Sequence, residues 1–115
     1  MSNLRAVGRI AEDRAAEFLL AQGFTLITRR YTVKGGEIDL VALDGETIVF
    51  VEVRHRDGHG MTPEESVGVK KMEYLARAAE SYMLAAGEKR DIRFDLIAID
   101  REGIRHHRDF FRPGL

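Results

Sequence analysis

Four charged side chains near the middle of the sequence have the types and spacing that could hold a divalent cation. Glu37 and Asp39 lie two residues apart in one apolar run, and Glu52 and Arg54 lie two residues apart in the next. Side chains two residues apart in a strand point to the same face, so each run would present two of these groups together. The acidic candidates offer only carboxylate oxygens, and the chain has no cysteine, which together favour Mg²⁺ or Mn²⁺ over zinc.

The two apolar runs are predicted to form a β-hairpin. Residues 37–43 and 46–54 are separated by an Asp-Gly pair, which is a strong signal for a two-residue loop. With this pair as the loop, Asp39 lies opposite Phe50. Asp39 and Glu52 then become diagonal neighbours on one face, roughly 7–8 Å apart at the backbone. We therefore expect their carboxylates to reach a common cation.

The predicted hairpin is apolar on both faces, which indicates that other elements cover it on both sides. Carboxylates at its end would be costly to bury unless they were paired, neutralised or bound to metal. The alternative to a metal site is a pair of salt bridges, for instance Glu52 with Arg29 and Asp39 with Arg54. Structural ion networks also concentrate charge, so the sequence leaves both interpretations open.

Hydrophobic periodicity and turn residues predict the elements that position these groups. Glu12 lies at the edge of the apolar stripe of the first helix, with small residues one turn away on either side. In chain order, the predicted elements are a helix over 4–22, strands over 25–31, 37–43 and 46–54, a helix from the capping box at Thr62 to about Ala86, a buried strand over 92–100 and a short edge strand over 104–108.

The order of elements and the composition predict a single α/β domain over residues 1–115, with a loose tail from about Phe111. The chain is 32% charged and 44% hydrophobic, a globular balance. The charged N-terminal residues lack the apolar run of a signal peptide, and no apolar stretch approaches the roughly 20 residues of a membrane helix. We therefore expect a cytoplasmic protein without a membrane partner.

Basic residues gather at several points, although the net charge of −1 argues mildly against a general nucleic-acid coat protein. Each basic cluster alone is typical of a solvated surface. The four histidines carry no ligand spacing and are expected to be solvated loop residues, although His55 and Arg56 could touch phosphate. The candidate nucleic-acid contacts are Arg29, Arg30, Lys34, Arg56, Lys70 and Lys71.

The chain resembles the YraN family of predicted endonuclease-like bacterial proteins from about Gly8 to Phe110. The resemblance rests on GRIAEDRAAEFL, GGEIDLVALDGETIVFVEVRHR, VKKMEYLARAAESYM and IRFDLIAI, of which GEIDL and FVEVR at this spacing are specific. It implies a PD-(D/E)XK, restriction-endonuclease-like core: a three-layer domain with a mixed central sheet flanked by helices, in the order α-β-β-β-α-β with a further β-strand. Relatives of this family include archaeal Holliday-junction resolvases and restriction-type endonucleases.

The resemblance assigns roles residue by residue. Asp39 of GEIDL corresponds to the first metal-binding aspartate of the fold, and Glu52 of VEVR corresponds to the acidic residue of its E-x-K element. Val53 matches the position whose backbone carbonyl often ligates the ion. Glu12 matches a helix-one glutamate that joins the metal site in resolvase-like members. Arg54 stands where lysine usually stands, as in a good part of this family. Asp39, Glu52, Arg54 and Glu12 are the implied catalytic residues, with Glu37 and His55 as accessory candidates.

Two departures from the family pattern bear on catalysis. Arg54 cannot lose a proton in a protein, so it cannot act as a base, although it can steady phosphate charge. Water activation would then fall to the metal, or to Lys71 if that side chain reaches the site. Arg30 also precedes Tyr31 where asparagine is expected.

Three hypotheses follow. The first is a Mg²⁺-dependent endodeoxyribonuclease whose first substrates to try, by analogy with resolvases, are branched DNAs. The same analogy suggests a homodimer. The second is a nucleic-acid-binding module that kept the fold and lost turnover, motivated by the missing lysine. The third is a structural or interaction protein with salt-bridged acidic residues, motivated by the near-neutral net charge.

Overall fold

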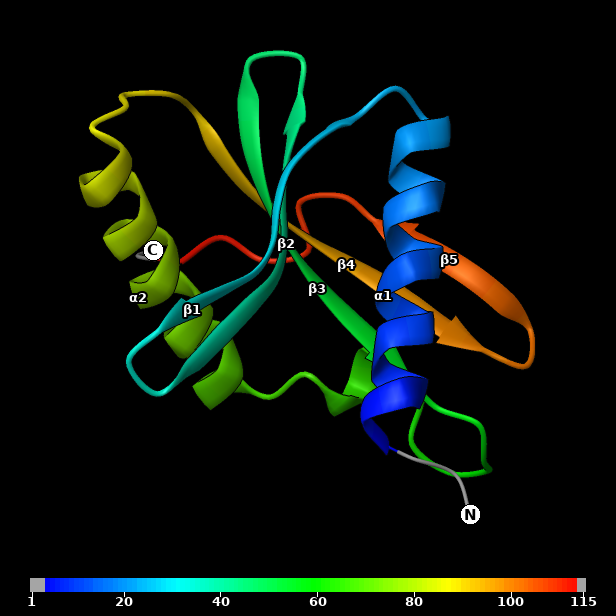
Figure 1. Ribbon diagram of the computed structural model, residues 1–115. Coiled ribbons are helices and arrows are strands. Elements are labelled where there is room, and N and C mark those ends of the chain that lie inside the picture. The colour runs from blue at the N-terminus through cyan, green and yellow to red at the C-terminus, as the bar shows by residue number, and fades with distance from the viewer. Residues whose placement is uncertain (1–3, 114–115) are drawn as a thin grey trace.

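The computed structural model describes residues 4–113 as a five-stranded sheet with one long helix on each side (Figure 1). The strands lie in chain order, and every neighbouring pair is antiparallel except the third and fourth, which are parallel. The α/β class and the predicted order of elements are confirmed. The elements are α1 (Leu4–Ala21), β1 (Thr25–Val33), β2 (Gly36–Asp44), β3 (Thr47–His55), the short 3₁₀ helix η1 (Glu64–Ser66), α2 (Val69–Ala86), β4 (Ile92–Asp100) and β5 (Gly103–His107).

Helix α1 covers one face of the sheet through small side chains. Ala11, Ala15 and Leu19 are buried against Val49 and Val51 of β3. These residues recur four positions apart, so they form one stripe of the helix. Because alanine side chains are short, this stripe allows the backbone of α1 to lie close to the sheet. Glu12 lies at the edge of the stripe.

Helix α2 covers the opposite face with larger partners. Leu75 and Ala79 pack against Phe50 of β3 and Phe94 of β4. The parallel pairing of β3 with β4 needs a crossover connection, and η1 with α2 supplies it. The prediction that the β2–β3 hairpin is covered on both faces is therefore confirmed.

The start of α2 differs from the prediction. The Thr62–Glu65 capping box does form, with its two reciprocal hydrogen bonds at 3.1 and 3.2 Å, but it begins η1 and not the long helix. Val67 is buried in an extended conformation, and Gly68 is extended as well. The anchored Val67 side chain separates η1 from α2, so the long helix begins only at Val69.

Two further expectations about the C-terminal part were wrong. The tail is packed at Phe111, whose ring stacks on Phe94 with centroids 4.6 Å apart; residues 114–115 lie outside the described residues. His106 is not a solvated loop residue. It lies in β5 with a side chain only 6% exposed, and its Nε2 is 2.8 Å from Asp95 Oδ2. His107, also in β5, contacts Glu64. The pairing of β5 with β4 is what carries these side chains inward.

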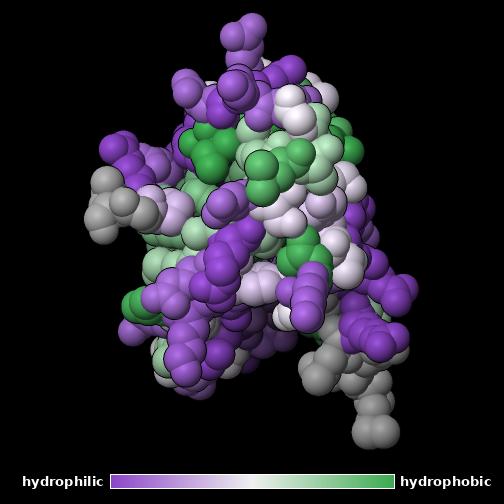
Figure 2. Space-filling model, turned by 90° about the vertical axis from the view of Figure 1, so that its left-hand side faces the viewer, coloured by the Kyte–Doolittle hydropathy of each residue, from purple (hydrophilic) through white to green (hydrophobic). Residues whose placement is uncertain are grey.

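The outer face of α2 is mixed in polarity. Figure 2 shows this side of the molecule, where polar side chains lie between separate apolar patches. Val69 and Leu84 are the most exposed of the large apolar side chains of α2. Within residues 4–113, no helix is long and apolar enough to span a membrane.

Candidate metal centre

The β2–β3 hairpin has a different register from the one predicted. Asp44 belongs to the strand ladder, and the loop consists of Gly45 and Glu46. Gly45 has a φ of +62°, which suits the first position of a type II′ loop, whereas the predicted loop would need positive φ at Asp44 as well. Relative to the predicted pairing, each residue of β2 is paired with a residue two positions further along β3. A shift of two positions by itself leaves every side chain on the face that was predicted for it. Continuing the ladder one position past its last pair places Asp39 directly opposite Glu52, not diagonal to it.

Strand β2 turns sharply at Asp39. Ile38 belongs to the cluster beneath α2, whereas Leu40 belongs to the cluster beneath α1. Strict alternation would have put both on one face, so the side chains of β2 change face at this point. In β1, the residue opposite Asp39 is Arg30, which has a left-handed φ of +52°. The irregularity thus crosses both strands, and it lets acidic residues of β2 approach α1.

Three carboxylates converge at this turn. Glu12 of α1 meets Glu37 and Asp39 of β2, and one oxygen from each lies within 4.8 Å of the others. Glu37 was expected only as an accessory residue, but the structure gives it a place equal to that of the two predicted ligands. An oxygen cluster of this size matches the ligands that Mg²⁺ and Mn²⁺ take.

Asp39 is held in an environment that disfavours its negative charge. Burial, reinforced by the charge of Glu52, raises the pKa of Asp39 to about 8. One hydrogen bond opposes this effect, because the Val53 N–H donates to Asp39 Oδ2 at 2.8 Å. The contact that Val53 makes is therefore through its N–H, and ligation through its carbonyl stays a prediction. A cation beside Asp39 would supply the positive charge that the site lacks.

Glu52 is buried beside two basic side chains. Its Oε2 lies 2.9 Å from an Arg54 guanidinium nitrogen and 3.6 Å from Lys71 Nζ. Lys71 of α2 thus reaches Glu52, which meets the condition set for it as an alternative to the metal in water activation; that role stays a prediction. Glu52 Oε1 is also buried, and within the described residues it has no hydrogen-bond partner. An unpaired carboxylate oxygen in the interior is costly, so this atom points to a ligand as its natural partner.

Salt bridges do form on Glu12 and Glu52, as the alternative interpretation expected, but not between the pairs named as instances. Arg29 pairs with Asp13 and not with Glu52, and Arg54 pairs with Glu52 and not with Asp39. Both arginines lie nearer to other carboxylates because the hairpin register and the turn at Asp39 differ from those assumed. Among residues 4–113, Asp39 has no ion pair.

The predicted nucleic-acid contacts fall into two groups. Arg30 lies at the carboxylates, with its Nε 2.9 Å from Glu12 Oε1, and Lys71 lies at Glu52. Arg29 lies next to them on β1. The structure does not bring the others into the cluster: Lys34 is exposed in the β1–β2 turn, Arg56 is exposed just after β3, and Lys70 is exposed on α2. His55 pairs with Asp57 at 3.1 Å.

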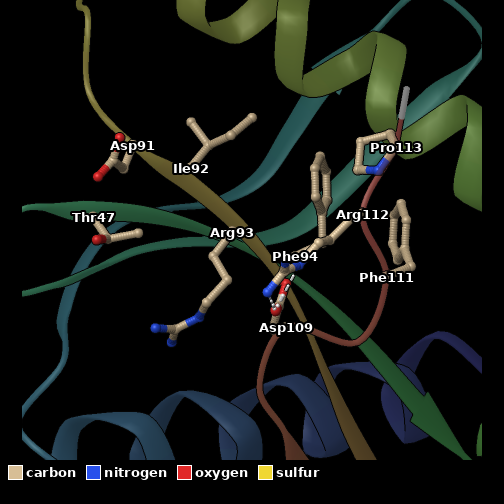
Figure 3. Close-up of a pocket in the computed structure, with 9 residues that line it drawn as sticks. All are labelled: Thr47, Asp91, Ile92, Arg93, Phe94, Asp109, Phe111, Arg112 and Pro113. Atoms are coloured by element: carbon tan, nitrogen blue, oxygen red, sulfur yellow. Dashed lines mark hydrogen bonds and ion pairs between the residues drawn. The ribbon is translucent and has the colours of Figure 1, made fainter. Parts of the chain in front are cut away.

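A larger hollow lies elsewhere on the molecule. It measures about 640 Å³ and lies between the start of β4 and the C-terminal tail (Figure 3). Its arginines are already paired: Arg93 contacts Asp95 and Asp44, and Arg112 contacts Asp109, as the dashed lines in Figure 3 show. It shares no residue with the carboxylate cluster, so we place the candidate site at the cluster.

The residues that were not anticipated lie on the first turns of α1. Arg5, Gly8 and Arg9 line a hollow whose other walls include Glu12 and Glu37. The signal was present in the sequence, because positions 5, 8, 9 and 12 follow the spacing of one helical stripe. Gly8 was noted only as a small neighbour of Glu12, and Arg5 and Arg9 are polar, so a search for apolar periodicity did not find the stripe as a whole.

The fold and the site define an α/β protein with an acidic cluster at a turn in its central sheet. Sequence comparison gives the family. The chain belongs to the uncharacterised protein family UPF0102, whose profile matches residues 11–99, and this is the YraN family that the motifs indicated. Similar proteins include a UPF0102 protein of Hahella chejuensis, 44% identical over 79% of this chain and 75% of its own length. A second, from Symbiobacterium thermophilum, is 44% identical over 84% and 83%. One from Vibrio cholerae is 40% identical over 98% and 94%.

Proposed function

We propose that this protein is a divalent-metal-dependent phosphodiesterase that acts on nucleic acid, with DNA as the expected substrate. The observation that carries the proposal is the convergence of carboxylate oxygens from Glu12, Glu37 and Asp39 within 4.8 Å. Glu52 lies opposite Asp39, and basic side chains flank both ends of this group. Metal-dependent phosphodiester hydrolysis needs acidic side chains that can bind a metal ion, next to basic side chains that can bind the phosphate. The site has side chains of both kinds.

The residues present fit a hard cation. The side-chain donors are all carboxylate oxygens, and Glu52 Oε1 is a buried oxygen without a partner among the described residues. Glu12, Glu37 and Asp39 would hold the cation, and Glu52 would complete the set. When bound, Mg²⁺ or Mn²⁺ lowers the pKa of a water and neutralises charge on the phosphate.

The protein's own side chains would then position the substrate. Arg54 carries a guanidinium group, which would neutralise the developing charge on the phosphate. Lys71 of α2 contacts Glu52, the carboxylate that Arg54 also contacts. Its amine can donate hydrogen bonds to phosphate oxygens and exchange a proton. The lysine that the E-x-K element lacks would thus be supplied by another element.

We also propose that the architecture is a small PD-(D/E)XK core. The order of elements, the mixed sheet between two helices and the position of Asp39 and Glu52 on neighbouring strands support this assignment. Fold likeness alone is weak support for an activity, so the chemistry must be tested directly.

The test is cleavage of labelled duplex, single-stranded, flapped and four-way-junction DNA in Mg²⁺ or Mn²⁺. We expect cleavage that falls at least about a hundredfold in Asp39→Asn, since loss of a ligand should exceed the 10–100-fold effect of losing an outer-shell partner. Glu80→Gln, at an exposed position of α2, is the matched control and should cleave normally. Cleavage that persists in Asp39→Asn, or that does not need the cation, would contradict the proposal. Gel filtration of the same samples tests the homodimer proposed by analogy.

One feature favours a second candidate, a nucleic-acid-binding protein without turnover. Arg54 occupies the lysine position and is itself paired with Glu52. This alternative predicts DNA binding that weakens as salt rises, together with no cleavage of any of these substrates. Mn²⁺ calorimetry separates both candidates from a purely structural protein, which would give no heat of binding that depends on Asp39.

A further inference from the structure

A hollow of about 410 Å³ adjoins the carboxylate cluster. It is lined by one stripe of α1 and by residues of β1 and β2. We call it the arginine hollow, after the three arginines among its lining residues: Arg5, Gly8, Arg9, Glu12, Arg30 and Glu37.

The arginine hollow shares a wall with the candidate metal centre. Glu12 and Glu37 belong to both the hollow and the carboxylate cluster. A group bound in the hollow would therefore lie next to a group bound at the cluster. A second hollow of about 340 Å³ is lined by Arg9, Arg29 and Arg30 together with Asp13, which is paired with Arg29, so arginine side chains continue along β1.

The charges of the arginine hollow favour an anion. Three guanidinium groups line the hollow together with two carboxylates. Arg30 Nε lies 2.9 Å from Glu12 Oε1, and a divalent cation on the carboxylates would compete with Arg30 for that oxygen. Guanidinium groups bind phosphate oxygens in a bidentate manner, so phosphate is the anion that this lining suits.

Gly8 makes room for the anion. A Cβ atom built on Gly8 meets nothing within 4 Å, so open space lies above the backbone at this point of α1. Glycine in the interior of a helix is unfavourable compared with alanine, and no close packing at Gly8 explains its presence. A larger side chain at this position would project between Arg5 and Arg9.

We infer that the arginine hollow binds a phosphate group of a nucleic-acid strand, next to the phosphodiester held at the carboxylates. The inference deepens the proposed function and rests on it for the neighbouring phosphodiester. The strand would pass from Arg54 and Lys71, across the carboxylates, to Arg9 and Arg30. The phosphate is either a backbone phosphodiester or a terminal monophosphate, and the two sources can be separated experimentally.

Binding is measured with fluorescently labelled single-stranded DNA, with and without a 5′-phosphate, in Ca²⁺ over a series of salt concentrations. Arg9→Gln should weaken binding about fivefold to tenfold and reduce the slope of log affinity against log salt by about one, as expected for one lost phosphate contact. Gly8→Leu should weaken binding similarly without changing any charge. Circular dichroism checks that each variant is folded.

Two variants on the same helix serve as controls. Arg14→Gln removes an exposed arginine that lines neither hollow, and Ala21→Leu adds a leucine at an exposed position far from Gly8. Neither should weaken binding by more than about twofold.

The inference is overturned if Arg9→Gln binds as well as Arg14→Gln, if Gly8→Leu binds as well as Ala21→Leu, or if the wild-type protein binds neither oligonucleotide. An effect of Arg9→Gln on both oligonucleotides identifies a backbone phosphate, and an effect only on the 5′-phosphorylated one identifies a terminal phosphate. If the protein cleaves DNA but Arg9→Gln has no effect on binding, the proposed function is retained and the phosphate site in the arginine hollow is contradicted. If binding depends on Arg9 but no substrate is cleaved, the phosphate site is retained and the proposed activity is contradicted.

Discussion

Two aspartates in this protein, the buried Asp95 and the partly buried Asp39, lie in opposite electrostatic environments. Burial and the charge of Glu52 raise the pKa of Asp39 to about 8. Burial would also raise the pKa of Asp95, but hydrogen bonds from His106, Arg93 and a backbone N–H outweigh it and lower that pKa to about 2. Asp95 is thus stabilised in its charged form by the protein itself, whereas Asp39 has no ion pair among the described residues and is the carboxylate that the proposed cation would stabilise.

The lowered pKa of Asp95 predicts a pH dependence of stability. An unfolded aspartate titrates near 3.9, so the folded protein keeps Asp95 charged to lower pH than the unfolded chain does. Its contribution, about 2 kcal/mol, is fully present above about pH 4 and is lost as the pH falls toward 2. Urea unfolding between pH 5 and pH 2 measures this loss.

Asp95→Asn should remove this part of the pH dependence. Asp91→Asn, at an exposed position four residues earlier, should keep it. If the two variants lost stability in parallel with the wild-type protein as the pH fell, the hydrogen bonds to Asp95 would not be the cause.

Metal binding should appear as a gain in stability that depends on Asp39. A ligand at 100 times its Kd stabilises the folded state by about 2.7 kcal/mol, which for a domain of this size raises Tm by roughly 10 °C. We expect Mn²⁺ to raise the Tm of the wild-type protein and of Glu80→Gln but not of Asp39→Asn. Without metal, Asp39→Asn should be at least as stable as the wild type, since the burial and the charge of Glu52 that raise the pKa of Asp39 to about 8 disfavour a charge there and asparagine carries none. If Mn²⁺ raised the Tm of Asp39→Asn as much as that of the wild type, the cation would have to bind at a site that does not include Asp39.

At the scale of elements, the β1–β2 turn is held against α2 by a close contact. A Cβ atom on Gly36 would lie 2.8 Å from the Tyr74 hydroxyl and 3.0 Å from the ring carbon that bears it. Gly36→Ala should therefore push Tyr74 and the start of α2 away from the turn, at a cost of about 1–3 kcal/mol. Gly58→Ala, where an added Cβ meets nothing within 4 Å, is the control in urea unfolding.

Tyr74→Phe gives a second measure of this contact. The Tyr74 hydroxyl is buried, and within the described residues it has no hydrogen-bond partner. Its removal alone should cost little or should stabilise the protein. In the double variant it should recover part of the loss caused by Gly36→Ala. If the changes in the free energy of unfolding were additive in the double variant, the side chains at positions 36 and 74 would not be in contact.

At the scale of the whole molecule, the C-terminal tail closes the α2 side of the core. Phe111 is partly buried and stacks on Phe94 beside the hollow of Figure 3. Phe111→Ala should lower the free energy of unfolding by about 1–2 kcal/mol, through lost burial and the lost ring pair. Arg112→Ala, whose side chain is 72% exposed, should change it by less than about 0.5 kcal/mol. Equal effects of the two would mean that the tail is not part of the core.

The local features of this protein follow from its amino-acid order. The stripe of Ala11, Ala15 and Leu19 predicts α1, and the break between two apolar runs predicts the hairpin, because side-chain periodicity reflects which face is buried. The spacing of Asp39 and Glu52 in two specific motifs likewise indicates the candidate site without any knowledge of how the chain packs.

Tertiary packing alone decided how these residues meet. The hairpin loop consists of Gly45 and Glu46, and this register places Asp39 opposite Glu52. The irregularity of β2 at Asp39 brings Glu37 close to Glu12. Lys71 reached Glu52 from another element. Such meetings join residues far apart in the chain, and they depend on backbone conformation and on how closely helices approach the sheet, which local periodicity does not contain.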